Sequence, residues 1–174
     1  DHNPSHMAGP VREDLTIRTA RMLVYIGQFG KAIRVLAESF AAFDEKMVCQ
    51  GAGEAPCRQV VLSALRNIEG PDSELAMEVY LSLPNRDKGP SIIEMAQAAA
   101  EVSARLGAPV FGAKVLAAIA PRISPETMND HLLRTAELFL LGKDYARARV
   151  IFEFAQTSEP KGSALRSWSS IRKG

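Results

Sequence analysis

Apolar residues recur every three or four positions along almost the whole chain, which is the spacing of one face of an α-helix. No segment alternates between apolar and polar residues as a half-buried strand does, and no Asn-Gly hairpin signal is present. The pattern therefore predicts an all-α protein. Nine helices are expected, over residues 14–26, 32–43, 60–68, 75–83, 92–106, 110–119, 125–141, 145–156 and 160–171.

Short turns rich in glycine and proline separate these predicted helices. Gly70-Pro71 and Gly107-Ala108-Pro109 break the chain, and Ser124-Pro125-Glu126 is a strong start signal for the seventh helix. It combines a capping hydroxyl, proline at the first helical position and an acid beside the positive end of the helix dipole. Because most connections are only two to five residues long, consecutive helices must be antiparallel neighbours.

Alanines at a regular place in every second predicted helix suggest internal repetition. Ala148, Phe152 and Ala155 are followed by Pro160, and the same spacing recurs with Ala113, Ala117, Ala120 and Pro125. Two weaker copies start at Ala76 and Ala32. This spacing resembles the tetratricopeptide repeat, a helix pair of about 34 residues whose second helix carries alanine, a bulky residue four positions later, and then proline.

The resemblance implies a right-handed α-α superhelix of about four helix pairs, with residues 160–171 as a capping helix that covers the end of the stack through Trp168. Members of this family work as scaffolds and assembly factors, and they hold a partner segment in the concave groove formed by the first helix of each pair. The residues expected to pack inward are Thr19, Ala20, Leu23, Thr135, Ala136 and Phe139, and those expected to bind the partner are Ile17, Arg21, Val24, Leu133, Glu137 and Leu140.

The two cysteines lie at the two ends of the longest predicted connection. Cys49 and Cys57 flank the sequence Gln-Gly-Ala-Gly-Glu-Ala-Pro. Thiols at both ends of one loop between helices reach disulfide geometry easily, so a Cys49–Cys57 bridge is predicted. The alternative is a pair of unrelated buried thiols in a reduced protein. A bridge would place the protein in an oxidising compartment such as the periplasm rather than in the cytoplasm.

The first seven residues, which end in Ser-His-Met, resemble an expression-vector remnant and are set aside from fold reasoning. We expect the remaining residues, 8–174, to form a single helical-repeat domain taken or processed from a longer protein. The 21 basic and 20 acidic residues leave a net charge of +1, which argues against nucleic acid as a partner. No apolar run approaches the roughly 18 residues that a membrane helix needs.

Motifs for catalysis or metal binding are weak throughout the chain. His131 has no evident nucleophile or orienting partner and is expected to be a solvated residue near a helix start. Two sulfurs and one distant histidine do not complete a zinc site, so no metal or cofactor is expected. Gly27–Lys31 is too short for a phosphate-binding loop.

The sequence therefore predicts a non-enzymatic scaffold or assembly factor that binds another protein or peptide, in a secretion, motility or envelope system. The alternative is a structural segment of a larger protein that forms homo-oligomers end to end through the helix of Trp168.

Overall fold

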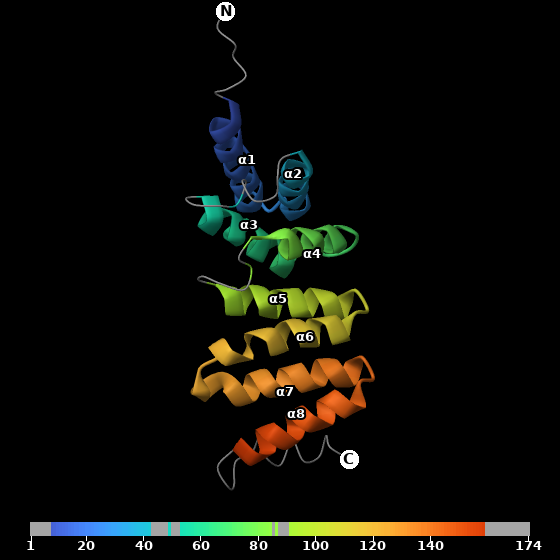
Figure 1. Ribbon diagram of the computed structural model, residues 1–174. Coiled ribbons are helices and arrows are strands. Elements are labelled where there is room, and N and C mark those ends of the chain that lie inside the picture. The colour runs from blue at the N-terminus through green and yellow to red at the C-terminus, as the bar shows by residue number, and fades with distance from the viewer. Residues whose placement is uncertain (1–7, 43–48, 50–52, 85, 87–90, 159–174) are drawn as a thin grey trace, which may run out of the picture. The chain divides into compact units, whose positions relative to one another are not determined.

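The computed structural model describes residues 8–42, 49, 53–84, 86 and 91–158 (Figure 1). This part of the chain forms eight α-helices and contains no strand, so the prediction of an all-α protein is confirmed. The first seven residues and the predicted capping helix with Trp168 lie outside the described residues.

The chain divides into two compact units, residues 1–91 and residues 92–174. The superhelix of helix pairs, as one domain over residues 8–174, stays a prediction. The first unit contains α1 (Ala8–Tyr25), α2 (Phe29–Ala42), α3 (Glu54–Asn67) and α4 (Asp72–Ser82). The second contains α5 (Ile92–Arg105), α6 (Pro109–Ile119), a 3-10 turn (Ala120–Arg122), α7 (Pro125–Leu141) and α8 (Tyr145–Ser158).

In the first unit, α1 and α2 pack side by side, and both contact α3, while α4 contacts α2 and α3. The first two helices run steeply in the view, whereas α3 and α4 cross beneath them (Figure 1). Small and branched side chains fill the space between the four helices. The core contains the fully buried residues Ala20, Ala32, Ile33, Leu36, Val61, Ala64 and Ala76.

In the second unit, α5 to α8 lie side by side in chain order, each antiparallel to the one before it (Figure 1). Their facing sides form one hydrophobic core. Its most buried members are Ala96, Ala100, Ala113, Leu116, Ala136, Ala148, Phe152 and Ala155.

Three of the helix pairs are joined by the same turn. The backbone N–H of Gln28, Ala108 and Asp144 donates to the carbonyl of the residue five positions earlier, in each case at 2.8 Å. The residue before each of these donors has a left-handed backbone, with φ of 75° at Gly27, 77° at Gly107 and 61° at Lys143. This arrangement is the Schellman motif, which satisfies the last carbonyls of a helix. The pairs α1–α2, α5–α6 and α7–α8 therefore share one register.

The shared turn corrects the alignment expected for α6. Counting five residues on from each left-handed position makes Gly112 the equivalent of Ala32 and Ala148, where the sequence pattern aligned Ala113. A Cβ added to Gly112 would lie 2.7 Å from the carbonyl oxygen of Ala100 in α5. Glycine, the smallest residue, therefore lies at a point where α6 packs closely against the backbone of α5.

The residues that follow in α6 obey the corrected register. Leu116 and Ile119 are buried and correspond to Phe152 and Ala155 of α8. The predicted pair, Ala117 and Ala120, is exposed and half-buried respectively. The predicted alignment of α6 was therefore wrong by one residue. It searched for alanine, and so it missed the glycine at the equivalent position of close helix packing.

The predicted start of α7 is confirmed, with Ser124 as the residue before the helix and Pro125 in its first turn. The Ser124 hydroxyl lies 3.0 Å from the Thr127 hydroxyl and makes no bond to a backbone N–H of the helix. The Glu126 carboxylate accepts hydrogen bonds from its own backbone N–H and from the Ser124 hydroxyl, which lower its pKa. The Glu126 carboxylate, rather than the Ser124 hydroxyl, therefore accepts from one free backbone N–H at this helix start.

We expect Gly112→Ala to destabilise the protein. The new methyl group would collide with backbone atoms of α5, which move only if the helices separate, and overpacking of this kind costs about 1–3 kcal/mol. Urea denaturation measures the change. Lys114→Ala, at an exposed position of the same helix, is the matched control and should change stability by less than about 0.5 kcal/mol. Equal stability of wild type and Gly112→Ala would contradict the close approach.

Candidate functional site

A groove in the second unit is the main candidate for a binding site. Its volume is about 680 Å³, within the range of roughly 300–1,000 Å³ typical of ligand sites. Side chains of α6, α7 and α8 line it, and nearly all of them are apolar. The lining residues are Lys114, Ala117, Ala118, Phe139, Ala146, Arg147, Val150 and Ile151.

The position of Arg147 in this groove follows from the turn before α8. Asp144 accepts a hydrogen bond from the backbone N–H of Arg147 at 3.3 Å, and its other oxygen lies 2.6 Å from the Arg147 guanidinium. The guanidinium carbon is 5.8 Å from the centre of the Phe139 ring, a cation–π distance. One carboxylate therefore caps the helix and holds a positive charge over the aromatic ring.

The outer face of α8 extends the apolar surface beyond the groove. Val150 and Phe154 are one helical turn apart and are 65% and 59% exposed. The opposite face of the helix, with Ala148, Phe152 and Ala155, is buried. Exposed apolar residues that gather on one face mark interaction sites more often than scattered ones do.

The groove lies beside α6 and α8, which are the second helices of their pairs, whereas the sequence pattern placed a groove on the first helices. Ile17 and Leu133 are only 6% and 5% exposed, so they belong to the core, whereas the expected register had both of them facing an open groove. The expectation that these two residues face the groove was therefore wrong, because both side chains are packed inside the protein. Partner binding by the predicted residues stays a prediction.

The other predicted partner-binding residues differ in exposure. Val24, Glu137 and Leu140 are half-buried, and Arg21 is exposed. Glu137 lies 3.4 Å from Arg134 on the same helix. Of the residues expected to pack inward, Ala20, Thr135, Ala136 and Phe139 are buried, Leu23 is half-buried, and Thr19 is exposed.

Val150 and Phe154 were not predicted as site residues. The sequence signal that could have found them is their spacing of four residues, on the face of α8 opposite Ala148 and Ala155. Helical periodicity assigns such residues to a core by default, so the signal needs the packing of α8 before it can be interpreted.

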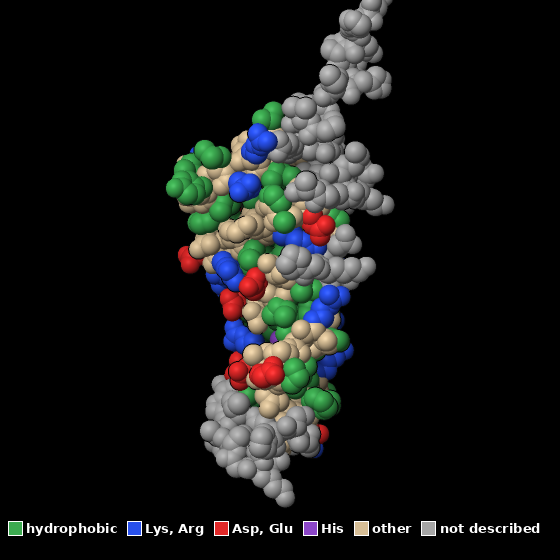
Figure 2. Space-filling view, turned by 90° about the vertical axis from the view of Figure 1, so that its left-hand side faces the viewer, with side chains coloured by type: hydrophobic (Ala, Val, Ile, Leu, Met, Phe, Trp, Pro, Cys, Tyr) green, Lys and Arg blue, Asp and Glu red, His purple; other side chains and the backbone are tan. Residues whose placement is uncertain are grey.

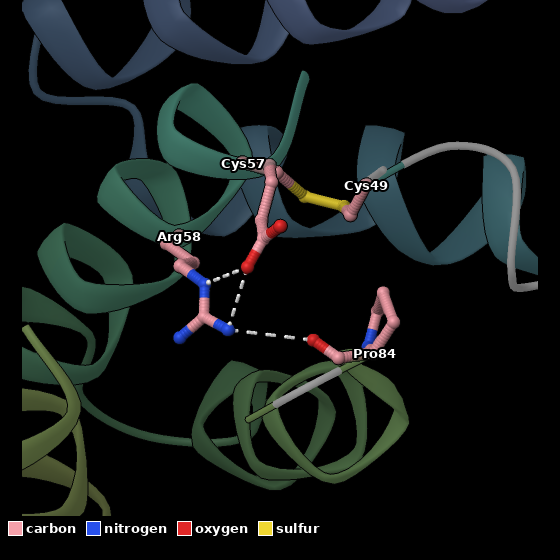
Figure 3. The surroundings of a disulfide bond; sticks show 5 residues. Cys49, Cys57, Arg58 and Pro84 are labelled. Carbon is pink, nitrogen blue, oxygen red and sulfur yellow. Dashed lines mark hydrogen bonds and ion pairs between the residues drawn. A yellow bond between two sulfur atoms is a disulfide. The ribbon is translucent and has the colours of Figure 1, made fainter. Parts of the chain in front are cut away.

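Cys49 and Cys57 lie at disulfide distance, with Cα atoms 5.7 Å apart, and both are buried (Figure 3). Cys57 is in the first turn of α3. The predicted pairing of these two cysteines is therefore what the structure contains.

The next residue, Arg58, ties the same turn to the end of α4. Its side chain is buried, and its Nε donates to Glu54 Oε1 at 3.1 Å, while Nη2 donates to the Pro84 carbonyl at 3.5 Å (Figure 3). The Cys49–Cys57 disulfide and the buried guanidinium of Arg58 therefore both fix the start of α3.

Reduction of the disulfide should lower the free energy of unfolding by about 2–3 kcal/mol, because the unfolded chain regains the freedom of the loop between the cysteines. Denaturation with and without dithiothreitol measures this difference. The Cys49→Ser/Cys57→Ser variant should match the reduced protein and show no response to the reductant. A wild-type protein that is indifferent to dithiothreitol would contradict the bridge.

His131 is buried, which corrects the expectation of a solvated residue near a helix start. Its Nε2 donates to the Leu116 carbonyl at 2.9 Å. Leu116 is in the last turn of α6, where carbonyls lack partners within the helix. The histidine therefore caps α6 from α7. Burial lowers the pKa of His131, and the hydrogen bond to Leu116 offsets part of this shift.

Because the native state favours neutral His131, the unfolded chain takes up the proton first as the pH falls. Stability is complete above the ordinary histidine pKa of about 6.5 and decreases as the pH falls from there toward the lowered native value. We expect urea denaturation from pH 7.5 to 5 to show this decrease. His131→Gln, which keeps a donor but does not titrate, should reduce it; an identical pH dependence in both proteins would contradict the assignment.

A polar cavity of about 450 Å³ lies at the turn between α1 and α2, in the first unit. Asp72 of α4 faces Gly30 there and accepts a hydrogen bond from Arg34 at 2.8 Å. The Asp72 carboxylate therefore lies at the start of α2. Gly30 allows this close approach, since a Cβ at that position would collide with the Asp72 carboxylate.

Charged side chains of both signs are interleaved on the face of the described residues that Figure 2 shows. Within the described residues, no group of three or more His, Cys, Asp or Glu side chains is placed to hold a metal ion. None of the helices in that part of the chain combines the length and apolar character needed to cross a membrane.

No protein-family model matches the chain, no curated protein matches its sequence, and no solved structure matches its fold.

Proposed function

We propose that this chain is a non-enzymatic protein–protein interaction module, a scaffold or assembly factor, that holds a segment of a partner protein in the groove of its second unit. The observation that carries the proposal is the open apolar groove over Phe139, bordered by α6 and α8. Concave apolar surfaces between helices are suited to an amphipathic helix or an extended segment.

The edges of the groove indicate the chemistry of the bound segment. Among the residues that the structure describes, Lys114 and Arg147 are the only charged ones that line it, and both are basic. Apolar side chains of the partner would cover Val150 and Ile151, and a carboxylate beside them would be attracted to Lys114, since Arg147 already pairs with Asp144. We therefore expect a segment that combines bulky apolar residues with an acid.

The three equivalent turns support a tetratricopeptide-like repeat as the basis of the fold, since repeated hairpins are how this family builds binding surfaces. The cysteine pair supports an oxidising compartment such as the periplasm. A role in secretion, motility or envelope assembly agrees with both features.

Val150→Asp should weaken partner binding by at least about tenfold, because it places a buried carboxylate in the apolar contact. A photoreactive amino acid at Val150 would first identify the partner in cells, with Leu106, exposed in the same unit but outside the groove, as the control position. The purified partner is then titrated against wild type and both aspartate variants, Val150→Asp and Leu106→Asp.

Circular dichroism and thermal denaturation should show that both variants fold, since both positions are exposed. Equal affinity of wild type and Val150→Asp for the purified partner would reject the groove as its binding site. Equal losses of affinity in Val150→Asp and Leu106→Asp would show that the change in net charge, and not the groove, weakens binding.

A further inference from the structure

Within the described residues of the second unit, His131 is the only titratable side chain that is buried. It belongs to α7, and its Nε2 donates to the carbonyl of Leu116 in α6. The two residues that follow Leu116 in the chain, Ala117 and Ala118, line the groove together with Lys114 of the same helix. We call Lys114, Ala117 and Ala118 the α6 wall. The buried histidine is therefore bonded to the residue directly before two members of this wall.

The Leu116 carbonyl needs a donor from outside α6 because the helix changes its hydrogen-bond pattern there. In a continuing α-helix, the N–H of Ala120 would donate to Leu116, four residues earlier. It donates to the Ala117 carbonyl instead, and the 3-10 turn Ala120–Arg122 follows. The imidazole N–H of His131 takes the place of the missing backbone donor. It thereby fixes the last turn of α6, which carries two residues of the α6 wall.

The same hydrogen bond connects two sides of the groove. Phe139, which lies beneath the groove, is on α7 about two helical turns beyond His131. We propose that His131 is a positioning residue for the groove. Its bond to Leu116 holds the α6 wall against α7, so that loss of the bond, by substitution or by protonation of the ring, weakens binding of the partner segment. This inference rests on the proposed function, since it assigns a means of regulation to the same groove.

A proton on His131 would place a charge in the interior of the protein. Burial is the main cause that lowers the pKa of His131, the hydrogen bond to Leu116 opposes it, and no charged group is among the causes. An unpaired buried charge is costly, so the protonated ring is stabilised by moving toward water, which breaks the bond to Leu116.

The charged side chains around His131 leave it without a buried counter-ion. Those on α7 and on the elements in closest contact with it are all exposed or half-buried. They are Glu126, Asp130, Arg134 and Glu137 on α7, Lys114 on α6, Arg122 on the 3-10 turn, and Arg147, Arg149 and Glu153 on α8. Protonation of the ring is therefore not offset by a carboxylate buried beside it.

Amide hydrogen exchange measures the positioning directly, without a ligand. In His131→Leu, which removes the donor, the N–H groups of Ala120 and Ile123 after α6 should exchange about tenfold faster than in wild type at the same pH, because local opening no longer has to break the bond from His131. The N–H of Ala108, which donates to Ser103 at the other end of α6, is the control and should exchange at an unchanged rate. His131→Gln, which keeps a donor, should restore the wild-type rates.

Binding is measured with the dye 1-anilinonaphthalene-8-sulfonate as the probe, because it combines an apolar ring system with an acid that stays ionised from pH 7.5 to 5. Loss of bound dye in Val150→Asp, with binding kept in Leu106→Asp, assigns the dye to the groove. Wild type should then bind the dye about two- to tenfold more weakly at pH 5 than at pH 7.5, the range expected for one hydrogen bond. His131→Leu should bind weakly at both pH values, whereas His131→Gln should bind as wild type does at pH 7.5 and keep that affinity at pH 5.

Loss of the fold would give the opposite signal, since a loosened core exposes apolar surface and binds more dye. Circular dichroism at both pH values checks that each variant is folded. Equal exchange at Ala120 in wild type and His131→Leu would overturn the proposal, as would faster exchange combined with unchanged dye affinity. The same pH dependence in wild type and His131→Gln would overturn the acid sensitivity. Dye binding that survives Val150→Asp would count against the proposed function of the groove, and the exchange rates alone would then decide the role of His131.

Discussion

The close approach of paired helices is the constraint on which the rest of the structure depends. Alanine at positions 20, 32, 136 and 148 is fully or almost fully buried, and Gly112 brings the backbone of α6 against that of α5. A Cβ added to Gly142, after α7, would collide with the side chain of Val110 in α6. Because interiors are packed to the density of organic crystals, these contacts fix where the larger side chains can go. Leu116, Phe139 and Phe152 fill one shared core as a result, and the edge of that core is the floor of the groove.

The helices and most of their ends could be predicted from the sequence, because periodicity and the glycine and proline turns act locally. Pro125 and Gly107 mark an actual start and an actual end of a helix. The register of α6 could not be predicted in the same way. Ala113 and Gly112 are both small and both buried, and the backbone conformation at Gly107 together with the close approach of Gly112 to Ala100 distinguishes them.

The candidate sites were harder to predict, since exposure depends on which neighbours each helix has. Cys49 and Cys57 were predictable because a short loop brings its two ends together whatever the rest of the fold does. The burial of His131 was not predictable, since its hydrogen-bond partner is the carbonyl of Leu116, fifteen residues away on another helix. Ile17 and Leu133 are apolar residues at helical spacing, as are Met22 and Val150, yet the first two are buried and the other two face outward.

The lysine at the left-handed position after α7 has an energetic consequence of its own. Two equivalent turns use glycine there, while Lys143 adopts φ of 61° with a side chain, which costs about 1–2 kcal/mol. Glycine would relieve that strain but would give the unfolded chain more freedom, worth roughly 0.4–1 kcal/mol. It would also remove a cation from the negative end of the helix dipole, worth about 0.3–1 kcal/mol. These effects nearly cancel, so exchange of Lys143 for glycine should be close to neutral for folding.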